Sequence, residues 1–154
     1  MTTIYANQQW IFIALIFFSI IGYIAFIRWQ DRKWIERRFG SRKILAMSFG
    51  VNYFGRASEP GKPRKSSGFL LLLQDQLFYR SRTARLELSI TGKNIARVYP
   101  DSGIKGYELH QSVIKIDFIN ENNAHDSAAF KVPYPPQWIH AIEHNLLKNN
   151  PTFP

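Results

Sequence analysis

The sequence predicts one membrane-spanning α-helix followed by a single mainly β domain that ends in a second, amphipathic helix. Three observations lead to this fold class. An uncharged apolar run lies near the N-terminus, apolar and polar residues alternate with a period of two through the middle of the chain, and an apolar face of helical spacing follows the last cluster of prolines. The 154 residues leave room for one anchor and one domain of about 100 residues.

The composition limits the chemistry that the chain can perform. Its formal net charge of +9 predicts a surface that attracts anions, whether lipid headgroups, nucleic acid or an acidic partner protein. The chain contains no cysteine, which excludes disulfides, thiol catalysis and thiolate metal sites.

The apolar run from Trp10 to Ile27 predicts the membrane-spanning helix. No charge interrupts it, and at a rise of about 1.5 Å per residue it just crosses a hydrocarbon core of about 30 Å. Trp10 and Trp29 lie where the two interfaces are expected. The alternative is a cleaved signal peptide, but residues 1–9 contain no Lys or Arg and Arg28 follows the run directly. We therefore expect a permanent anchor.

The charges after the apolar run predict its orientation. Basic residues far outnumber acidic ones there, which indicates that this end stays in the cytoplasm. Aromatic residues lie among these charges, so the segment either continues the helix outward or lies along the headgroups with its cations near anionic lipid. A topology signal alone and a lipid-binding role remain equal alternatives. The juxtamembrane cations are Arg28, Arg32, Lys33, Arg37, Arg38, Arg42 and Lys43.

Beyond Ile44 the pattern changes to short strands separated by turn residues. The first expected strand contains Gly50 and Gly55, which indicates a bend or a bulge. Loops are expected at residues 59–68 and 100–106, because Pro, Gly and Ser gather in both. About seven strands are expected, at residues 46–58, 69–73, 77–80, 86–90, 95–99, 113–119 and 128–132.

The last part of the chain predicts a helix. Three prolines end the final strand, and a helix is expected from Gln137 to near Lys148. Its apolar residues recur at spacings of three and four, which indicates one face packed on the strands. These residues are Trp138, Ile139, Ile142 and Leu146.

The succession of these segments resembles a pleckstrin-homology-like (PH-like) domain of the bacterial or GRAM-related kind. The likeness extends over residues 46–147. It depends on a glycine before a leucine-rich strand, a tight hairpin into an aromatic strand, the pair Ile95 and Val98, and Trp138 in the last helix. The resemblance implies a two-sheet, seven-stranded barrel or sandwich capped by a C-terminal helix, which serves as a binding platform and not as an enzyme. Family members that bind phosphoinositides have basic residues in the second strand, where this chain has FLLLL, so we do not expect specific inositol-lipid binding.

These expectations divide the chain into five parts. Residues 1–9 form a short non-cytoplasmic N-terminus, residues 10–27 span the membrane, and residues 28–43 form the basic juxtamembrane segment. Residues 44–149 form the cytoplasmic PH-like domain, and residues 150–154 form a tail.

Two basic clusters are candidates for contact with anionic lipid, because each cation held near an anionic leaflet contributes about 1 kcal/mol. The alternative for each cluster is a solvated turn whose charges keep the sheet edge soluble. The candidates are Lys62, Arg64 and Lys65 in the first loop, and Arg80, Arg82 and Arg85 at the next hairpin.

One pattern suggests catalysis. His140, Glu143 and His144 spell H-x-x-E-H, in which two histidines one helical turn apart bind zinc and the glutamate acts as a base. A third ligand is not evident, and a chance match on a polar helix face is the preferred interpretation. We expect no catalytic residues, no metal and no cofactor. Aromatic residues interleaved in short strands indicate a core, so we expect no nucleic acid partner.

Three hypotheses about function remain. The first is a non-enzymatic, single-pass scaffold or regulatory subunit of a membrane protein complex, acting by protein–protein interaction, with basic loops on anionic lipid. The second is a peripheral sensor of anionic lipid, and the third is a zinc-dependent hydrolase. The expected location is a bacterial inner (plasma) membrane with the N-terminus outside. The expected partners are anionic membrane lipids and another membrane protein or complex, and a homo-oligomer is compatible with the sequence.

Overall fold

The structure is a computed structural model that describes residues 2–148, with side chains from residue 8 onward. The expected tail, residues 150–154, lies outside the described residues. The chain forms two compact units, residues 1–41 and residues 42–154. The described part of the second unit, residues 42–148, is called the β domain below.

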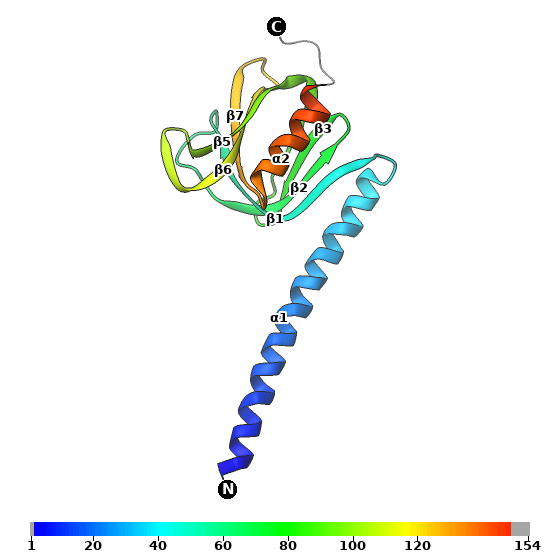
Figure 1. The fold of residues 1–154 in the computed structure, drawn as a ribbon, viewed down its shortest axis with the longest axis vertical. Coiled ribbons are helices and arrows are strands. Elements are labelled where there is room, and N and C mark those ends of the chain that lie inside the picture. The colour runs from blue at the N-terminus through cyan, green and yellow to red at the C-terminus, as the bar shows by residue number, and fades with distance from the viewer. Residues whose placement is uncertain (1, 149–154) are drawn as a thin grey trace. The chain divides into compact units, whose positions relative to one another are not determined.

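Helix α1 runs from Thr2 to Phe39 without a break (Figure 1). It contains no proline, and Arg37 and Arg38 in its last turn interact favourably with the negative end of the helix dipole. The segment after the apolar run therefore continues the helix. Within the described residues, the part from Gln8 to Phe39 is long and apolar enough to cross a membrane, with a mean hydropathy of 2.6 in its most apolar window, none of which is buried.

The β domain contains seven antiparallel strands in the order β4-β3-β2-β1-β7-β6-β5, which confirms the predicted number. A short 3₁₀ turn, Gly92–Asn94, connects β4 to β5. Strands β4 and β5 are the two edges of this order. The strand bounds are β1 Ile44–Arg56, β2 Ser66–Leu73, β3 Gln76–Ser81, β4 Glu87–Thr91, β5 Ile95–Ile104, β6 Tyr107–Ile119 and β7 His125–Lys131.

Strand β1 belongs to both halves of the sheet. It pairs with β2 between Ile44 and Tyr53, and with β7 between Asn52 and Arg56. The register of both pairings shifts along the strand, and Gly50 and Gly55 have φ angles of 72° and 103°. Glycine adopts such angles without the steric cost that other residues meet. The expected bend in the first strand is therefore confirmed.

The core of the β domain lies on the inner face of the curved sheet and under the C-terminal helix. Three buried rings meet at its centre, since those of Tyr53, Tyr79 and Phe130 have centroids 5.2 to 5.5 Å apart. Leu70 and Leu72 of β2 belong to the same cluster, as do Trp138, Ile142 and Leu146 of the C-terminal helix. Figure 1 shows this helix, α2, lying across the strands of the domain.

Helix α2 spans Pro135–Ile142 and continues as one π-helical stretch, Glu143–Leu147. It begins two residues before the expected start at Gln137. The first turn of a helix tolerates proline, because its N–H groups have no partner within the helix, so Pro135 and Pro136 begin the helix and do not exclude it. The end near Lys148 agrees with the prediction.

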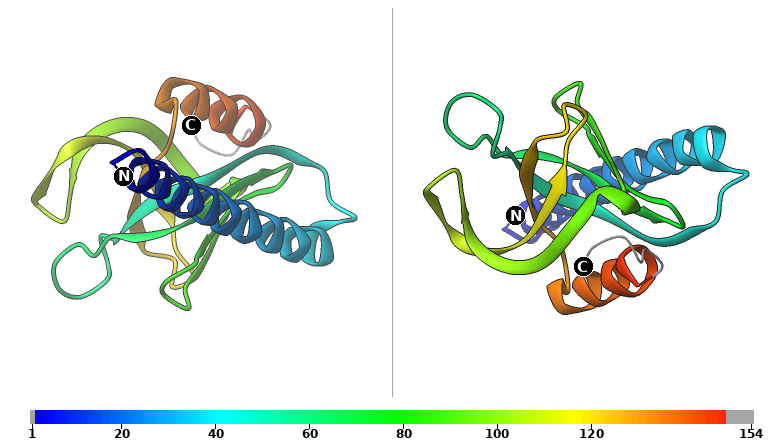
Figure 2. Two further views of the ribbon diagram at one scale, coloured as in Figure 1. Left: turned by 90° about the horizontal axis from the view of Figure 1, so that it is seen from below. Right: turned by 90° about the horizontal axis from the view of Figure 1, so that it is seen from above.

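The expected loop at residues 100–106 is wrong. Strands β5 and β6 continue through this region as one long curved hairpin, in which only Lys105 and Gly106 connect the strands (Figure 2). Pro100 is opposite Ile114 and lies in the edge strand β5. Proline lacks an N–H donor, but an edge strand uses only alternate donors, so it tolerates this residue.

Candidate functional site

Two loops of the β domain present basic side chains at the same end of the sheet. The loop between β1 and β2, residues 57–65, has Lys62, Arg64 and Lys65 exposed to solvent. The turn between β3 and β4, residues 82–86, has Arg82 and Arg85 exposed. These five residues are called the basic loop surface.

Backbone pairing brings the two loops together. The N–H of Arg82 donates to the carbonyl of Ser67 over 2.8 Å, and Gly68 pairs with Ser81 in the β2–β3 ladder. The β3–β4 turn is closed by the N–H of Ala84, which donates to Oγ of Ser81 over 2.9 Å. The two basic clusters that the sequence suggests separately therefore adjoin.

Hydrogen bonds to distant parts of the chain hold the base of the β1–β2 loop. The carboxylate of Asp126 accepts hydrogen bonds from the N–H and the hydroxyl of Ser58, and the N–H of Ala57 donates to the Ser127 carbonyl over 2.8 Å. Nζ of Lys105, in the turn of the β5–β6 hairpin, lies 3.4 Å from the carbonyl oxygen of Gly61. Strand β7 and the turn of the β5–β6 hairpin thus both contribute to the position of this loop.

A tyrosine and a glutamate complete the base of the loop. The hydroxyl of Tyr53 donates to Oε1 of Glu59 over 2.8 Å, and Nε of Arg56 lies 3.3 Å from the same oxygen. Burial raises the pKa of Tyr53 well above its usual range, and the neighbouring Glu59 carboxylate raises it further. This phenol is therefore a neutral hydrogen-bond donor at physiological pH.

Most cations of the basic loop surface lack acidic neighbours. Within the described part of the chain, Lys62, Arg64, Lys65 and Arg85 have no ion-pair partner. Arg80 differs, because it lies one residue inside β3 and its Nε is 3.6 Å from Oε1 of Glu87. An anion at this end of the domain would therefore meet several cations whose charge no carboxylate offsets.

The juxtamembrane cations lie on α1 and just after it. Arg28, Arg32, Lys33, Arg37 and Arg38 are exposed along the C-terminal part of the helix. Nζ of Lys33 lies 3.8 Å from the centre of the Trp29 ring, a cation–π contact between neighbouring turns. Within the second unit, Arg42 lies 3.6 Å from Asp75 and Lys43 is exposed.

The H-x-x-E-H residues lie on the solvent side of the C-terminal helix. The rings of His140 and His144 stack with their centroids 6.0 Å apart, and both side chains and that of Glu143 are exposed. Among the described residues, no group of three His, Asp or Glu side chains is arranged to hold a metal ion. The third ligand that a catalytic zinc site uses is therefore not found in this part of the chain.

Comparison with solved structures identifies the architecture. The chain is similar to the C-terminal domain of an unknown protein from Leishmania infantum, with a TM-score of 0.53, 17% identity, and coverage of 79% of this chain and 98% of that one. It is also similar to the Vps36 N-terminal PH domain, with a TM-score of 0.51, 13% identity, and coverage of 71% and 83%. The β domain has a PH-like fold. No protein-family model matches the sequence, and no curated protein matches it.

The sequence resemblance to a PH-like domain and the observed fold therefore agree. Sequence reasoning missed two features of this PH-like domain, namely the contact of Lys105 with the first loop and a hollow beside the edge strand β4. Both depend on which strands are neighbours, and no local pattern in the sequence contains that information.

Proposed function

We propose that this chain is a membrane-tethered, non-enzymatic PH-like module that acts as a scaffold or regulatory subunit of a membrane protein complex. The basic loop surface rests on anionic lipid and orients the module. The observation on which this depends is the junction of two cationic loops at one end of a domain that follows an apolar helix.

Support for the tether comes from the composition and exposure of α1. Its side chains between Trp10 and Phe26 are apolar or small, and large ones such as Phe12 and Phe18 are 69% and 70% exposed. Leaving so many large apolar side chains in water is unfavourable, whereas lipid accepts them. The excess of Lys and Arg after the run favours a cytoplasmic position for the PH-like domain.

The strength of the lipid contact defines its role. Five cations at about 1 kcal/mol each give about 5 kcal/mol, which corresponds to a dissociation constant of roughly 0.2 mM. Such a contact is too weak to recruit a free domain from dilute solution. A short tether provides an effective concentration of about a millimolar, at which the contact is mostly formed. The basic loop surface therefore orients a domain that the helix already holds at the membrane.

The absence of cysteine allows a direct test of the lipid contact. Thr83 is exposed beside Arg82, so Thr83→Cys places one environment-sensitive fluorophore at the basic loop surface. In nanodiscs of phosphatidylcholine with about 30% phosphatidylserine, an anionic surface that attracts Lys and Arg, we expect a blue shift of the label on the full-length chain. High salt and the triple change Lys62→Gln, Arg64→Gln and Lys65→Gln should both abolish this shift, because the contact is electrostatic.

The matched control removes three positive charges at exposed positions outside the basic loop surface. Lys93, Lys131 and Lys148 are exposed, and their triple change to Gln should leave the blue shift intact. Equal spectra in neutral and anionic nanodiscs, or equal effects of the two triple variants, would reject the lipid contact.

A separate experiment tests the scaffold role. The full-length chain is cross-linked in intact membranes, solubilised in a gentle detergent and purified, with residues 1–43 alone as the control. We expect one membrane protein to be retained by the full-length chain and not by the control. Retention of the same proteins by both would assign the interaction to the helix and remove the proposed role of the PH-like domain.

A further inference from the structure

Strand β4 has one edge without a neighbouring strand, and its hydrogen-bonding pattern identifies the groups that face away. The N–H of Ser81 donates to the carbonyl of Leu86, and the N–H of Gly92 donates to the carbonyl of Asp75. Between these two closing bonds, hydrogen-bonded and non-hydrogen-bonded pairs alternate in an antiparallel ladder. The bonds to β3 therefore come from Leu88 and Ile90. The backbone groups of Ser89 and Thr91, which alternate with these, point away from β3.

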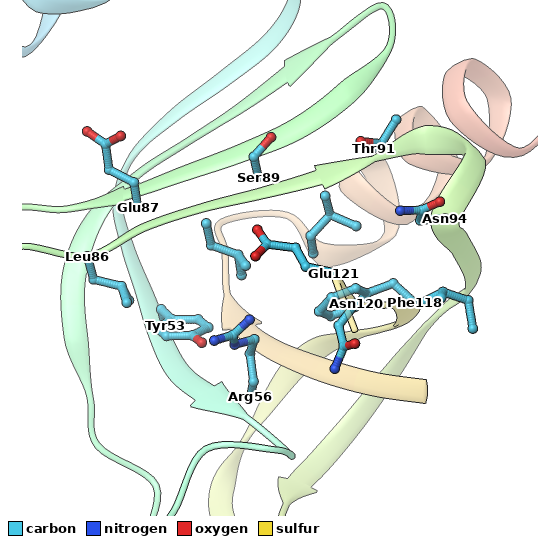
Figure 3. A pocket seen from close by; sticks show the side chains of 13 residues that line it. Tyr53, Arg56, Leu86, Glu87, Ser89, Thr91, Asn94, Phe118, Asn120 and Glu121 are labelled. Carbon is cyan, nitrogen blue, oxygen red and sulfur yellow. The ribbon is translucent and has the colours of Figure 1, made fainter. Parts of the chain in front are cut away.

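A hollow of about 340 Å³ lies directly along this free edge. Its near wall is formed by residues 86–91 with Asn94, and its far wall by residues 118–121 at the end of β6. Figure 3 shows Asn120 and Glu121 on the side of the hollow away from β4, with Tyr53 and Arg56 at one end. The edge thus has free space beside it, at the lower end of the usual size of ligand pockets.

The sequence of β4 protects this edge only weakly. Proteins block an exposed strand edge with charged side chains, above all lysine, with proline, with a bulge or by keeping the strand short, and the five-residue segment ELSIT has only its length and the single charge of Glu87. The other edge strand, β5, contains both Pro100 and Arg97. The two edges of the domain therefore differ, and β4 combines the outward-facing backbone groups of Ser89 and Thr91 with a hollow.

We propose that the hollow accepts one short extended segment of a partner protein, which adds to the sheet as a strand beside β4. The segment pairs its backbone with the groups of Ser89 and Thr91. Its inward side chains lie level with Leu88 and Ile90, whose side chains are buried, so small apolar residues fit there. Glu121 is exposed and has no ion-pair partner among the described residues, so it favours a lysine or arginine in the segment.

This inference does not depend on the basic loop surface. The segment belongs to a protein partner, and the contact comes mainly from backbone hydrogen bonds, which salt affects little. Neutralising Lys62, Arg64 and Lys65 should therefore leave it intact, and loss of the lipid contact and loss of strand addition can be told apart.

The test uses the full-length chain in nanodiscs and random seven-residue peptides displayed on phage. We expect enriched peptides in which apolar residues alternate with polar ones and which include a cation. Ser89→Pro removes one N–H that faces the hollow and leaves the bonds to β3 in place, so it should weaken binding at least tenfold. Ser89→Ala, the matched control, should change affinity less than twofold. Peptides enriched against the Glu121→Gln variant should no longer favour a lysine or arginine.

A change in the peptide keeps the test independent of the fold of Ser89→Pro. Methylating the nitrogens of alternate peptide residues should abolish binding for one set of positions and not for the other, because only one edge of the added strand pairs with β4. Bound peptide should also slow amide hydrogen exchange at Ser89 and Thr91. Enrichment of no peptide, equal binding by both methylated sets, or unchanged exchange at these amides would each overturn the proposal.

Discussion

The N–H of Ser58 donates to Oδ1 of Asp126 over 3.0 Å, although 68 residues separate the two positions in the chain. The same carboxylate accepts hydrogen bonds from the Ser58 hydroxyl and, over 2.9 Å, from the N–H of Ser127. This buried carboxylate joins the start of the basic β1–β2 loop to β7. The position of the basic loop surface therefore depends in part on a carboxylate of strand β7.

Replacing Asp126 should destabilise the PH-like domain. Hydrogen bonds to a charged group contribute about 1.5–3 kcal/mol, so Asp126→Ala should lower the free energy of unfolding by about 2–3 kcal/mol. Thermal unfolding of the full-length chain in detergent should show a midpoint roughly 8–20 °C lower. Glu121→Ala removes an exposed carboxylate of the same charge and should change the midpoint little. Similar midpoints for the two variants would show that Asp126 has no such role.

Gly68 permits the close approach of β2 and β3. A Cβ at this position would overlap the carbonyl group of Arg80, so Gly68→Ala should separate the strands and cost about 3 kcal/mol or more. Gly61 provides the comparison, because its φ is 81° but a Cβ added there would meet no atom within 4 Å. Gly61→Ala should cost only about 1–2 kcal/mol, as expected for a left-handed conformation. Unfolding midpoints of the two variants measure this difference, and equal losses would contradict it.

Tyr53 should make the domain sensitive to alkaline pH. Burial raises its pKa, so the folded state keeps the phenol neutral while unfolded tyrosine ionises above about pH 10. The stability from this group is complete below about pH 10 and declines as the pH rises further. Tyr53→Phe should lose about 1 kcal/mol at about pH 8 and then lose stability more slowly between about pH 10 and 11.5. Unfolding midpoints across this range test the prediction, and parallel curves for both proteins would contradict it.

Asp101 should titrate at unusually low pH. A hydrogen bond from Nζ of Lys115, 3.0 Å away, lowers the pKa of this carboxyl, and the N–H of Ser102 lowers it further. The stability that it provides is therefore present above about pH 3.9 and is lost as the pH falls through the lower folded pKa. Lys115→Met should raise the pKa of Asp101, measured by NMR titration of its side chain. Lys131→Met, which removes an exposed charge, should leave it unchanged.

Local sequence patterns were sufficient to predict most elements of this fold. Alternating residues identified strands such as β4, in which buried and exposed side chains alternate, and a continuous apolar run identified β2, which is buried on both faces. The face of Trp138, Ile142 and Leu146 identified the helix. The β5–β6 hairpin was missed in part because Pro100 and Gly103 usually indicate a loop. Strand β5 accommodates these two residues because it lies at the edge of the sheet, and this edge position follows from the pairing of distant strands.

The candidate site, too, was predictable only in those features that local sequence determines. The charges of Lys62, Arg64 and Lys65 are evident from the sequence, but their proximity to Arg82 is not. The backbone bond between Arg82 and Ser67 depends on the register of β2 against β3, and a shift of one residue would turn each side chain to the other face. The free edge of β4 depends on the order of all seven strands.

The double pairing of β1 has a consequence for how the protein is made. Asn52 pairs with both Ser67 and Lys131, so its hydrogen bonds to β7 cannot form until residue 131 has left the ribosome. Helix α1 precedes β1 in the chain and is synthesised first. Pairing within the β domain is therefore completed only after nearly the whole chain has been made, and the period in which its strands are still unpaired is the stage at which misfolding is most expected.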